Sequence, residues 1–170
     1  MVDNLDSQPA QATAAAQREG PVESPSAQYQ LVSKLRGTLP RILEHQPVEL
    51  AYLYGSATTG QVTPFSDIDI AVVVDEDLAP RERLSLVLRL QLELVDRCNI
   101  PNADVRIIND APLVFQGRVV CDGILVYARD EQKRIAFEVD ARMRYFDYLP
   151  IHRQLQDAFF VDLRERGLYG

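Results

Sequence analysis

Four residues in two short segments carry the clearest chemical signal in the sequence. Gly55 and Ser56 follow one short apolar segment, and Asp67 and Asp69 stand at alternate positions where the next one begins. Because alternate side chains of a strand share a face, the two carboxylates would project together, roughly 6–7 Å apart at their Cα atoms. Neighbouring carboxylates repel one another unless a cation joins them, and Mg²⁺ prefers carboxylate oxygens together with substrate phosphates. The pair therefore predicts a magnesium site.

The Gly55-Ser56 turn predicts a phosphate site beside these acids. Glycine permits backbone conformations that other residues avoid and lets the main chain approach a bulky anion. The Ser56 hydroxyl and the neighbouring amides can donate to phosphate oxygens, and the dipole of a short helix starting at Ser56 would add to the attraction. Ser66, in the connecting loop, is a second candidate donor. Together with a metal, this segment would hold a nucleoside triphosphate.

A third acid, Asp104, stands in another short β-branched segment, residues 103–109, with Arg106 on the same face. If this strand lies beside the strand 68–74, three carboxylates converge. Three carboxylates can hold two metal ions about 3.5–4 Å apart, which clamps the attacking and leaving oxygens of an in-line phosphoryl displacement. Asp104 would bind the metal nearer the nucleophile or accept its proton, and Arg106 could stabilise charge nearby.

Each of these features has an ordinary explanation when it stands alone. An Asp-x-Asp at the start of a strand is usually a solvated strand end, a Gly-Ser is usually a turn, and Asp104 could be a surface acid. The combination of Gly55-Ser56 with Asp67-x-Asp69, flanked by two apolar strands, favours a site for a nucleoside triphosphate and its metals over these explanations.

Gly55-Ser56, ten intervening residues and Asp67-x-Asp69 resemble the signature of the minimal nucleotidyltransferases (MNT), relatives of DNA polymerase beta and kanamycin nucleotidyltransferase. The resemblance implies an α/β (α+β) fold of the polymerase beta type, with a small twisted mixed sheet and helices packed mainly on one face. It also implies that Asp67, Asp69 and Asp104 are catalytic ligands of two Mg²⁺ ions. Gly55 and Ser56 would bind the triphosphate of ATP.

A second part of the sequence, residues 137–150, resembles the C-terminal helix of the MNT proteins encoded beside HEPN toxins. In that pairing the MNT protein is an antitoxin that transfers AMP from ATP to a tyrosine of the HEPN ribonuclease. The resemblance therefore implies a protein adenylyltransferase with a HEPN toxin as its partner. Two alternatives stay open: transfer to a small hydroxylated molecule such as an aminoglycoside, and an antitoxin that inhibits by binding without catalysis.

Composition limits the classes of function. With 170 residues, 46% of them hydrophobic, the chain suits one domain with a tail. Its net charge of −7 and scattered basic residues give no sign of a nucleic-acid surface. No segment looks long enough to span a membrane, and no secretory signal is apparent. Cys98 and Cys121 read as buried free thiols, so we expect a cytoplasmic protein.

The chain divides early. Residues 1–27 are rich in Ala, Gln, Ser and Pro and predict a disordered tail, and residues 28–170 predict the nucleotidyltransferase domain with a C-terminal helical extension. In that domain the hydrophobic pattern predicts strands at 49–54, 68–74, 103–109 and 124–127, and helices at 28–45, 81–98, 112–120 and from about 130 onward.

Three details of these helices are predictions of their own. Gly37 and Pro40 should bend or break the first helix, and Pro150 should kink or end the last. The last helix carries apolar residues over so wide an arc that we expect it to pack on a second copy or on a toxin subunit, with packing within the chain as the alternative. The apolar side of the helix 81–98 is predicted to be Leu84, Val87, Leu88, Leu94, Val95 and Cys98.

Overall fold

The computed structural model describes residues 26–59 and 67–166 of the chain. Most of the predicted tail, residues 1–27, therefore lies outside the described residues. The described elements, in chain order, are α1 (Ala27–Leu43), β1 (Val48–Tyr54), the 3₁₀ turn η1 (Gly55–Thr58), β2 (Ile68–Val74), α2 (Pro80–Cys98), β3 (Ala103–Ile107), α3 (Leu113–Asp122), β4 (Ile124–Ala128) and α4 (Glu131–Arg166).

The four strands form one mixed sheet in the order β3-β2-β1-β4. β1 is antiparallel to both β2 and β4, whereas β2 and β3 are parallel. Parallel neighbours need a long crossover connection, and α2 supplies it. The predicted small mixed sheet is confirmed.

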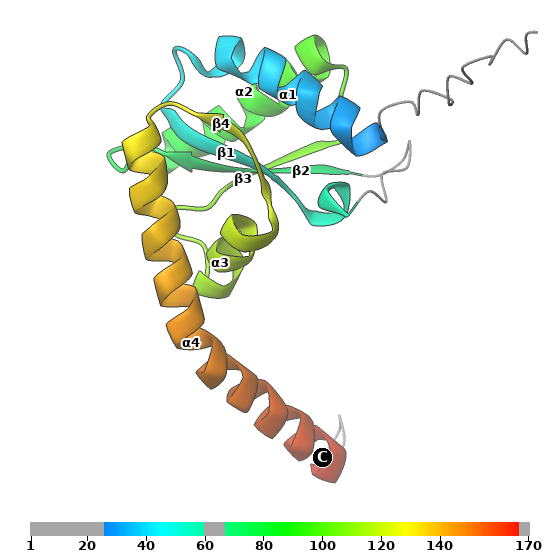
Figure 1. Cartoon of the computed structure of the whole chain (residues 1–170), viewed down its shortest axis with the longest axis vertical. Helices are drawn as coiled ribbons and strands as arrows, with labels where there is room; N and C mark the ends of the chain where they lie inside the picture. The colour runs from blue at the N-terminus through cyan, green and yellow to red at the C-terminus, as the bar shows by residue number, and fades with distance from the viewer. Residues whose placement is uncertain (1–25, 60–66, 167–170) are drawn as a thin grey trace, which may run out of the picture.

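Helices α1 and α2 cover one face of the sheet, and α3 and the first half of α4 lie on the other (Figure 1). The face under α1 and α2 holds the larger core, to which β2 contributes every second residue, as its alternation predicted. The second face holds a smaller cluster around Tyr52, Val73 and Ile108. The residues of β2 in the larger core are Ile68, Ile70, Val72 and Val74.

Helix α1 is continuous, so the predicted break at Gly37 or Pro40 is wrong. Pro40 lies close to the end of the helix, where losing one main-chain hydrogen bond is tolerated because Leu39, Ile42 and Leu43 are buried around it. Burial of the apolar side of α1 therefore outweighs the low helix propensity of Gly37 and Pro40.

The predicted apolar side of α2 is wrong in part. Leu94 and Cys98 are buried as expected, but Leu84 and Leu88 are more than half exposed. The leucines of α2 lie on several sides of the helix, so their spacing alone does not show which side faces the sheet. The side of α2 that packs on the sheet consists of Leu86, Leu90, Leu94 and Cys98.

Cys121, which lies on α3, is exposed, contrary to the prediction of a buried thiol.

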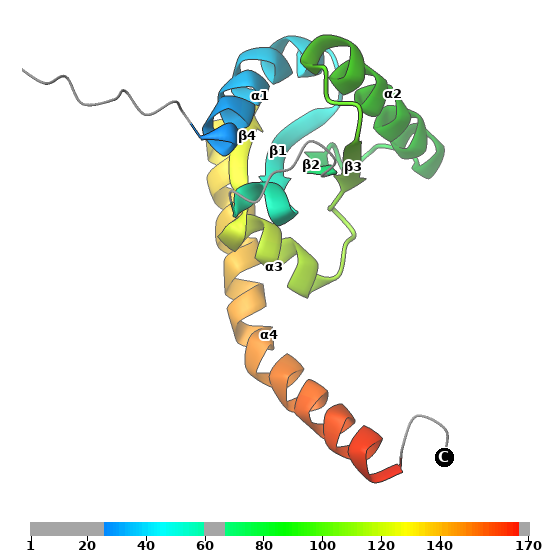
Figure 2. The ribbon, with the colours of Figure 1, turned by 90° about the vertical axis from the view of Figure 1, so that its right-hand side faces the viewer.

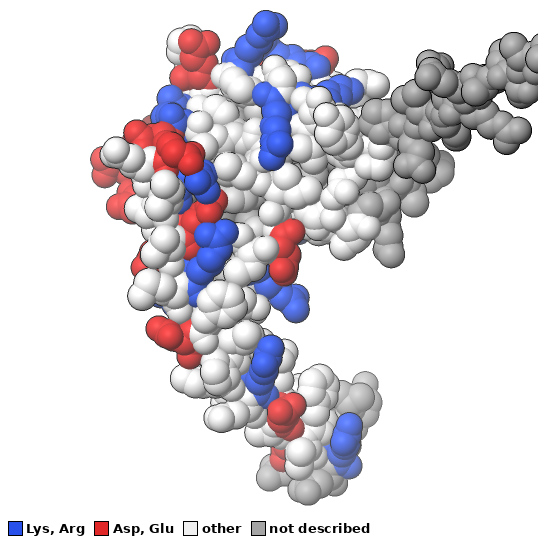
Figure 3. Space-filling model, in the orientation of Figure 1, with Lys and Arg blue, Asp and Glu red and all other residues white. Residues whose placement is uncertain are grey.

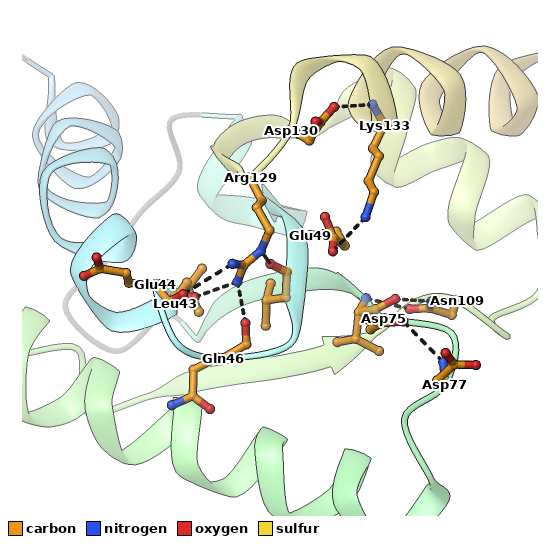
Figure 4. A network of polar contacts seen from close by, with 12 residues as sticks. Leu43, Glu44, Gln46, Glu49, Asp75, Asp77, Asn109, Arg129, Asp130 and Lys133 are labelled. Atoms are coloured by element: carbon orange, nitrogen blue, oxygen red, sulfur yellow. Dashed lines mark hydrogen bonds and ion pairs between the residues drawn. The ribbon is translucent and has the colours of Figure 1, made fainter.

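An arginine at the end of β4 ties α1 to the start of β1. The guanidinium of Arg129 donates to the main-chain oxygens of Leu43, Glu44, Gln46 and Val48 (Figure 4). The last carbonyls of a helix have no partner within it, so this side chain satisfies them. The contact holds the edge strand against the helix that covers it.

Helix α4 is held on the sheet by a buried carboxylate. Glu138 is 7% exposed and accepts from the Tyr52 hydroxyl at 3.1 Å, from Arg134 at 2.9 Å and from Arg142 at 2.9 Å. The helix then runs through Pro150 without ending, and its second half extends away from the rest of the structure (Figures 1 and 2). The prediction that Pro150 could end this helix is therefore wrong.

Glu138 should make stability depend on pH. Burial raises the pKa of this carboxyl, but hydrogen bonds from Arg134, Arg142 and Tyr52 outweigh burial and lower it below the ordinary 4.5. Because the folded pKa is depressed, the stabilisation is complete above about pH 4.5 and is lost as the pH falls further. We expect Glu138→Gln to lower the free energy of unfolding by about 2 kcal/mol at pH 7 in urea titrations.

The difference between Glu138→Gln and wild type should shrink as the pH falls through the lowered pKa of Glu138, since the wild-type carboxyl then becomes protonated too. Asp140→Asn removes an exposed partner of Arg144 one helical turn away and serves as the control, with a change under about 0.5 kcal/mol. A constant difference between Glu138→Gln and wild type across the whole pH range would contradict the role assigned to the ionised carboxylate.

Candidate active site

Strand register brings the predicted acids to one end of the sheet. Asp69 lies opposite Tyr54 of β1 and opposite Asp104 of β3. Residues paired across neighbouring strands share a face, so the Asp69 and Asp104 side chains project to the same side. Asp67 stands just before β2 and is exposed, two residues from Asp69. The strand that carries Asp104 therefore does lie beside the strand that carries Asp69.

Gly55 occupies a position that only glycine fits. Its φ is +72°, in the left-handed region, and a Cβ built on it would overlap Oδ2 of Asp69. The turn after β1 thus packs its main chain directly against the carboxylate. The predicted short helix is a single 3₁₀ turn of four residues, too short for a substantial dipole, so any anion bound here would rely on individual N–H and O–H donors. Ser56 is exposed on this turn.

The acids influence one another electrostatically. Burial raises the pKa of Asp69, the charges of Asp104 and Asp67 raise it further, and Arg106 opposes them. Neighbouring like charges disfavour the ionised form, and a bound cation would relieve that repulsion. The crowding fits the chemistry of a divalent metal site with carboxylate ligands.

Arg106 compensates part of this charge. Its Nε and Nη2 both donate to Oδ2 of Asp104, each at 2.9 Å. Within residues 26–59 and 67–166, no three His, Cys, Asp or Glu side chains are grouped so that they could hold a metal ion. A metal ion that used Oδ2 of Asp104 would have to displace the guanidinium.

Ser66, the second predicted phosphate donor, lies outside the described residues.

Two features beside the acids were not predicted from the sequence. The Tyr54 hydroxyl is buried without a partner among the described residues, and burial raises its pKa to about 12. Its ring packs edge to face on Phe115 of α3, with ring centroids 5.4 Å apart. A cavity adjoins this pair and Gly55, and Arg118 is among its lining residues. No spacing in the sequence could have placed α3 here.

Residues 38–132 match the family described as Polymerase beta, Nucleotidyltransferase, which covers more than half of the chain and includes β1, the turn and the three acids. The chain belongs to this nucleotidyltransferase family. No curated protein is a significant match to the chain.

Solved structures of the same fold come from toxin–antitoxin systems. A toxin–antitoxin structure with AMP-PNP is 23% identical, with a TM-score of 0.58, over 74% of this chain and 98% of that chain. A Shewanella oneidensis complex, described as a tri-AMPylated HEPN toxin with its MNT antitoxin, is 21% identical, with a TM-score of 0.55, over 76% of this chain and 98% of that chain. At these identities the likeness shows the fold, which agrees with the nucleotidyltransferase family.

No helix in the described ranges combines the length and apolar character that crossing a membrane requires.

Gly55 and Gly37 offer a matched pair of substitutions. Gly55→Ala would strain a left-handed residue and push against Asp69, so we expect the free energy of unfolding to fall by about 2 kcal/mol or more. Gly37 is an exposed helical glycine with open space around it, and Gly37→Ala should raise stability by up to about 1 kcal/mol. Urea unfolding measures both. Equal effects at the two positions would contradict the contact between Gly55 and Asp69.

Proposed function

We propose that this protein is an Mg²⁺-dependent nucleotidyltransferase that transfers AMP from ATP to a tyrosine hydroxyl of a HEPN toxin, and so acts as an antitoxin. The observation that carries the proposal is that Asp69 packs against the main chain of Gly55 and is paired in register with Asp104. The family match supports nucleotidyl transfer. The similar structures named as toxin–antitoxin complexes, one with AMP-PNP and one with an AMPylated toxin, support ATP and a HEPN partner.

The chemistry assigns a role to each acid. The acceptor oxygen attacks the α-phosphorus, the bond from that phosphorus to the oxygen bridging to the β-phosphate breaks, and pyrophosphate leaves with that oxygen. The proton of the acceptor hydroxyl passes to Asp104. Asp67 and Asp69 would hold both Mg²⁺ ions and Asp104 the one nearer the acceptor. The bound ions would neutralise phosphate charge in the transition state.

Alignment by the turn completes the site. The main chain at Gly55 can approach the phosphates because it carries no Cβ, and Ser56 is exposed to donate its hydroxyl. Such positioning and electrostatic stabilisation account for most of the rate of phosphoryl transfer enzymes. A nucleic-acid acceptor is less well supported, because basic and acidic side chains are interspersed along α4 on the face shown in Figure 3.

Replacing Asp69 by Asn tests the catalytic assignment. Loss of a metal ligand removes several kcal/mol of transition-state stabilisation, so AMP transfer to the co-purified toxin should fall more than about 100-fold. Intact-mass spectrometry of the toxin measures the transfer, and circular dichroism checks the fold. Asp96→Asn, at an exposed position on α2, is the control and should transfer normally. Near-normal transfer by both Asp67→Asn and Asp69→Asn would refute the assignment.

Replacing Arg106 by Gln tests the competition at Asp104. Without the guanidinium on Oδ2, the carboxylate is free for a cation, so the affinity for Mn²⁺ should rise several-fold while stability without metal falls. Electron paramagnetic resonance of free Mn²⁺ measures the affinity, and thermal unfolding measures the stability. Arg106→Lys should lie between wild type and Gln. Weaker Mn²⁺ binding by Arg106→Gln would show that Arg106 supports the metal site instead of competing for it.

A second candidate function, inhibition by binding alone, is favoured by the second half of α4. Large apolar side chains there are more than half exposed. A surface of this kind suits a protein partner. An Asp67→Asn, Asp69→Asn double variant that still neutralises the toxin would favour this candidate, and loss of neutralisation with intact binding would favour the enzyme. The exposed side chains are Ile151, Leu155, Phe159, Phe160 and Val161.

A further inference from the structure

A cavity lies between the turn that follows β1 and helix α3, which are neighbours in Figure 2. Its volume is about 320 Å³, which is in the range of small-molecule sites. The proposed function places Gly55 at the phosphates but gives no role to the side chains of α3 that line this cavity. Aromatic and polar side chains share its lining, which includes Tyr54, Gly55, Thr58, Phe115, Arg118 and Asp122.

Strand order places this cavity and Asp104 on opposite sides of Asp69. β3, which carries Asp104, flanks β2 on one side, and β1 and β4 follow on the other. The cavity is lined by Gly55, just after β1, and by Gly123, just before β4. In an in-line displacement the attacking and leaving oxygens lie on opposite sides of the phosphorus. With the acceptor at Asp104, as proposed above, the leaving pyrophosphate would lie toward β1, β4 and the cavity.

Arg118 supplies a cation on that side. Its side chain is exposed and makes no hydrogen bond or ion pair with any residue of the described ranges. Phe115, one helical turn earlier, packs on Tyr54 and so fixes α3 against the end of β1. An arginine held in this way can donate two parallel hydrogen bonds to a phosphate. Arg106, in contrast, is already paired with Asp104.

We infer that Arg118 is a further ligand of the β- and γ-phosphates, which would enter this cavity beside the turn at Gly55 and Ser56; the inference rests on the proposed function. Asp122 lies one turn after Arg118 and also lines the cavity, so its negative charge weakens phosphate binding. The affinity for phosphates is therefore set by opposite charges on one face of α3.

Calorimetric titration of the full chain with Mg²⁺ and, in turn, ATP, pyrophosphate and AMP tests this assignment. Arg118→Ala should weaken the binding of ATP and pyrophosphate about tenfold or more, as expected when a charge-assisted hydrogen bond is lost, and that of AMP less than about twofold. Asp122→Asn should strengthen pyrophosphate binding. Arg153→Ala, at an exposed position on the second half of α4, is the control and should bind all three ligands as wild type does.

The outcomes separate the two proposals. Suppose that wild type binds ATP, but Arg118→Ala binds ATP and pyrophosphate as tightly as wild type does, or its affinity for AMP falls as much as its affinity for ATP. The role assigned to Arg118 is then wrong, and the proposed function stands. If wild type binds no ATP in the presence of Mg²⁺, the proposed function fails and the inference fails with it.

Discussion

Repulsion among carboxylates at one end of a small sheet is the constraint on which the site depends. Asp69 is flanked in register by Asp104, and its Oδ2 lies where a Cβ at position 55 would be, against the main chain of Gly55. Folding therefore holds like charges together at some cost. Arg106 offsets part of that cost, and the proposed metal ions would offset the rest. The surrounding sheet and helices fix this arrangement before any ligand binds.

Much of this arrangement is visible in the sequence because it is local. The alternation of β2 predicted which side chains enter the core, and the β-branched segment around Asp104 predicted a strand, which the structure places beside β2. The role predicted for Gly55 was to let the main chain approach an anion closely. The structure adds a second reason, because a Cβ there would meet Asp69.

What the sequence could not predict depends on packing between distant elements. Leucines lie on several sides of α2, so only contact with the sheet decides that Leu86 and Leu90 are buried while Leu84 is exposed. The path of α3 past the end of β1 brings Arg118 near Gly55, although the two are far apart in the chain. The long α4 is likewise fixed by tertiary contacts, since Glu138 meets Tyr52 of β1.

The central claim is that Asp67, Asp69 and Asp104 bind divalent metal together beside Gly55. A crystal structure of the full chain with Mn²⁺ and a non-hydrolysable ATP analogue tests it most directly, because Mn²⁺ is located by its anomalous scattering. We expect anomalous peaks at metal–ligand distance, about 2.0–2.3 Å, from oxygens of all three acids, with Arg106 moved off Asp104. A bound analogue whose metal lies elsewhere, with Arg106 still paired to Asp104, would contradict the account.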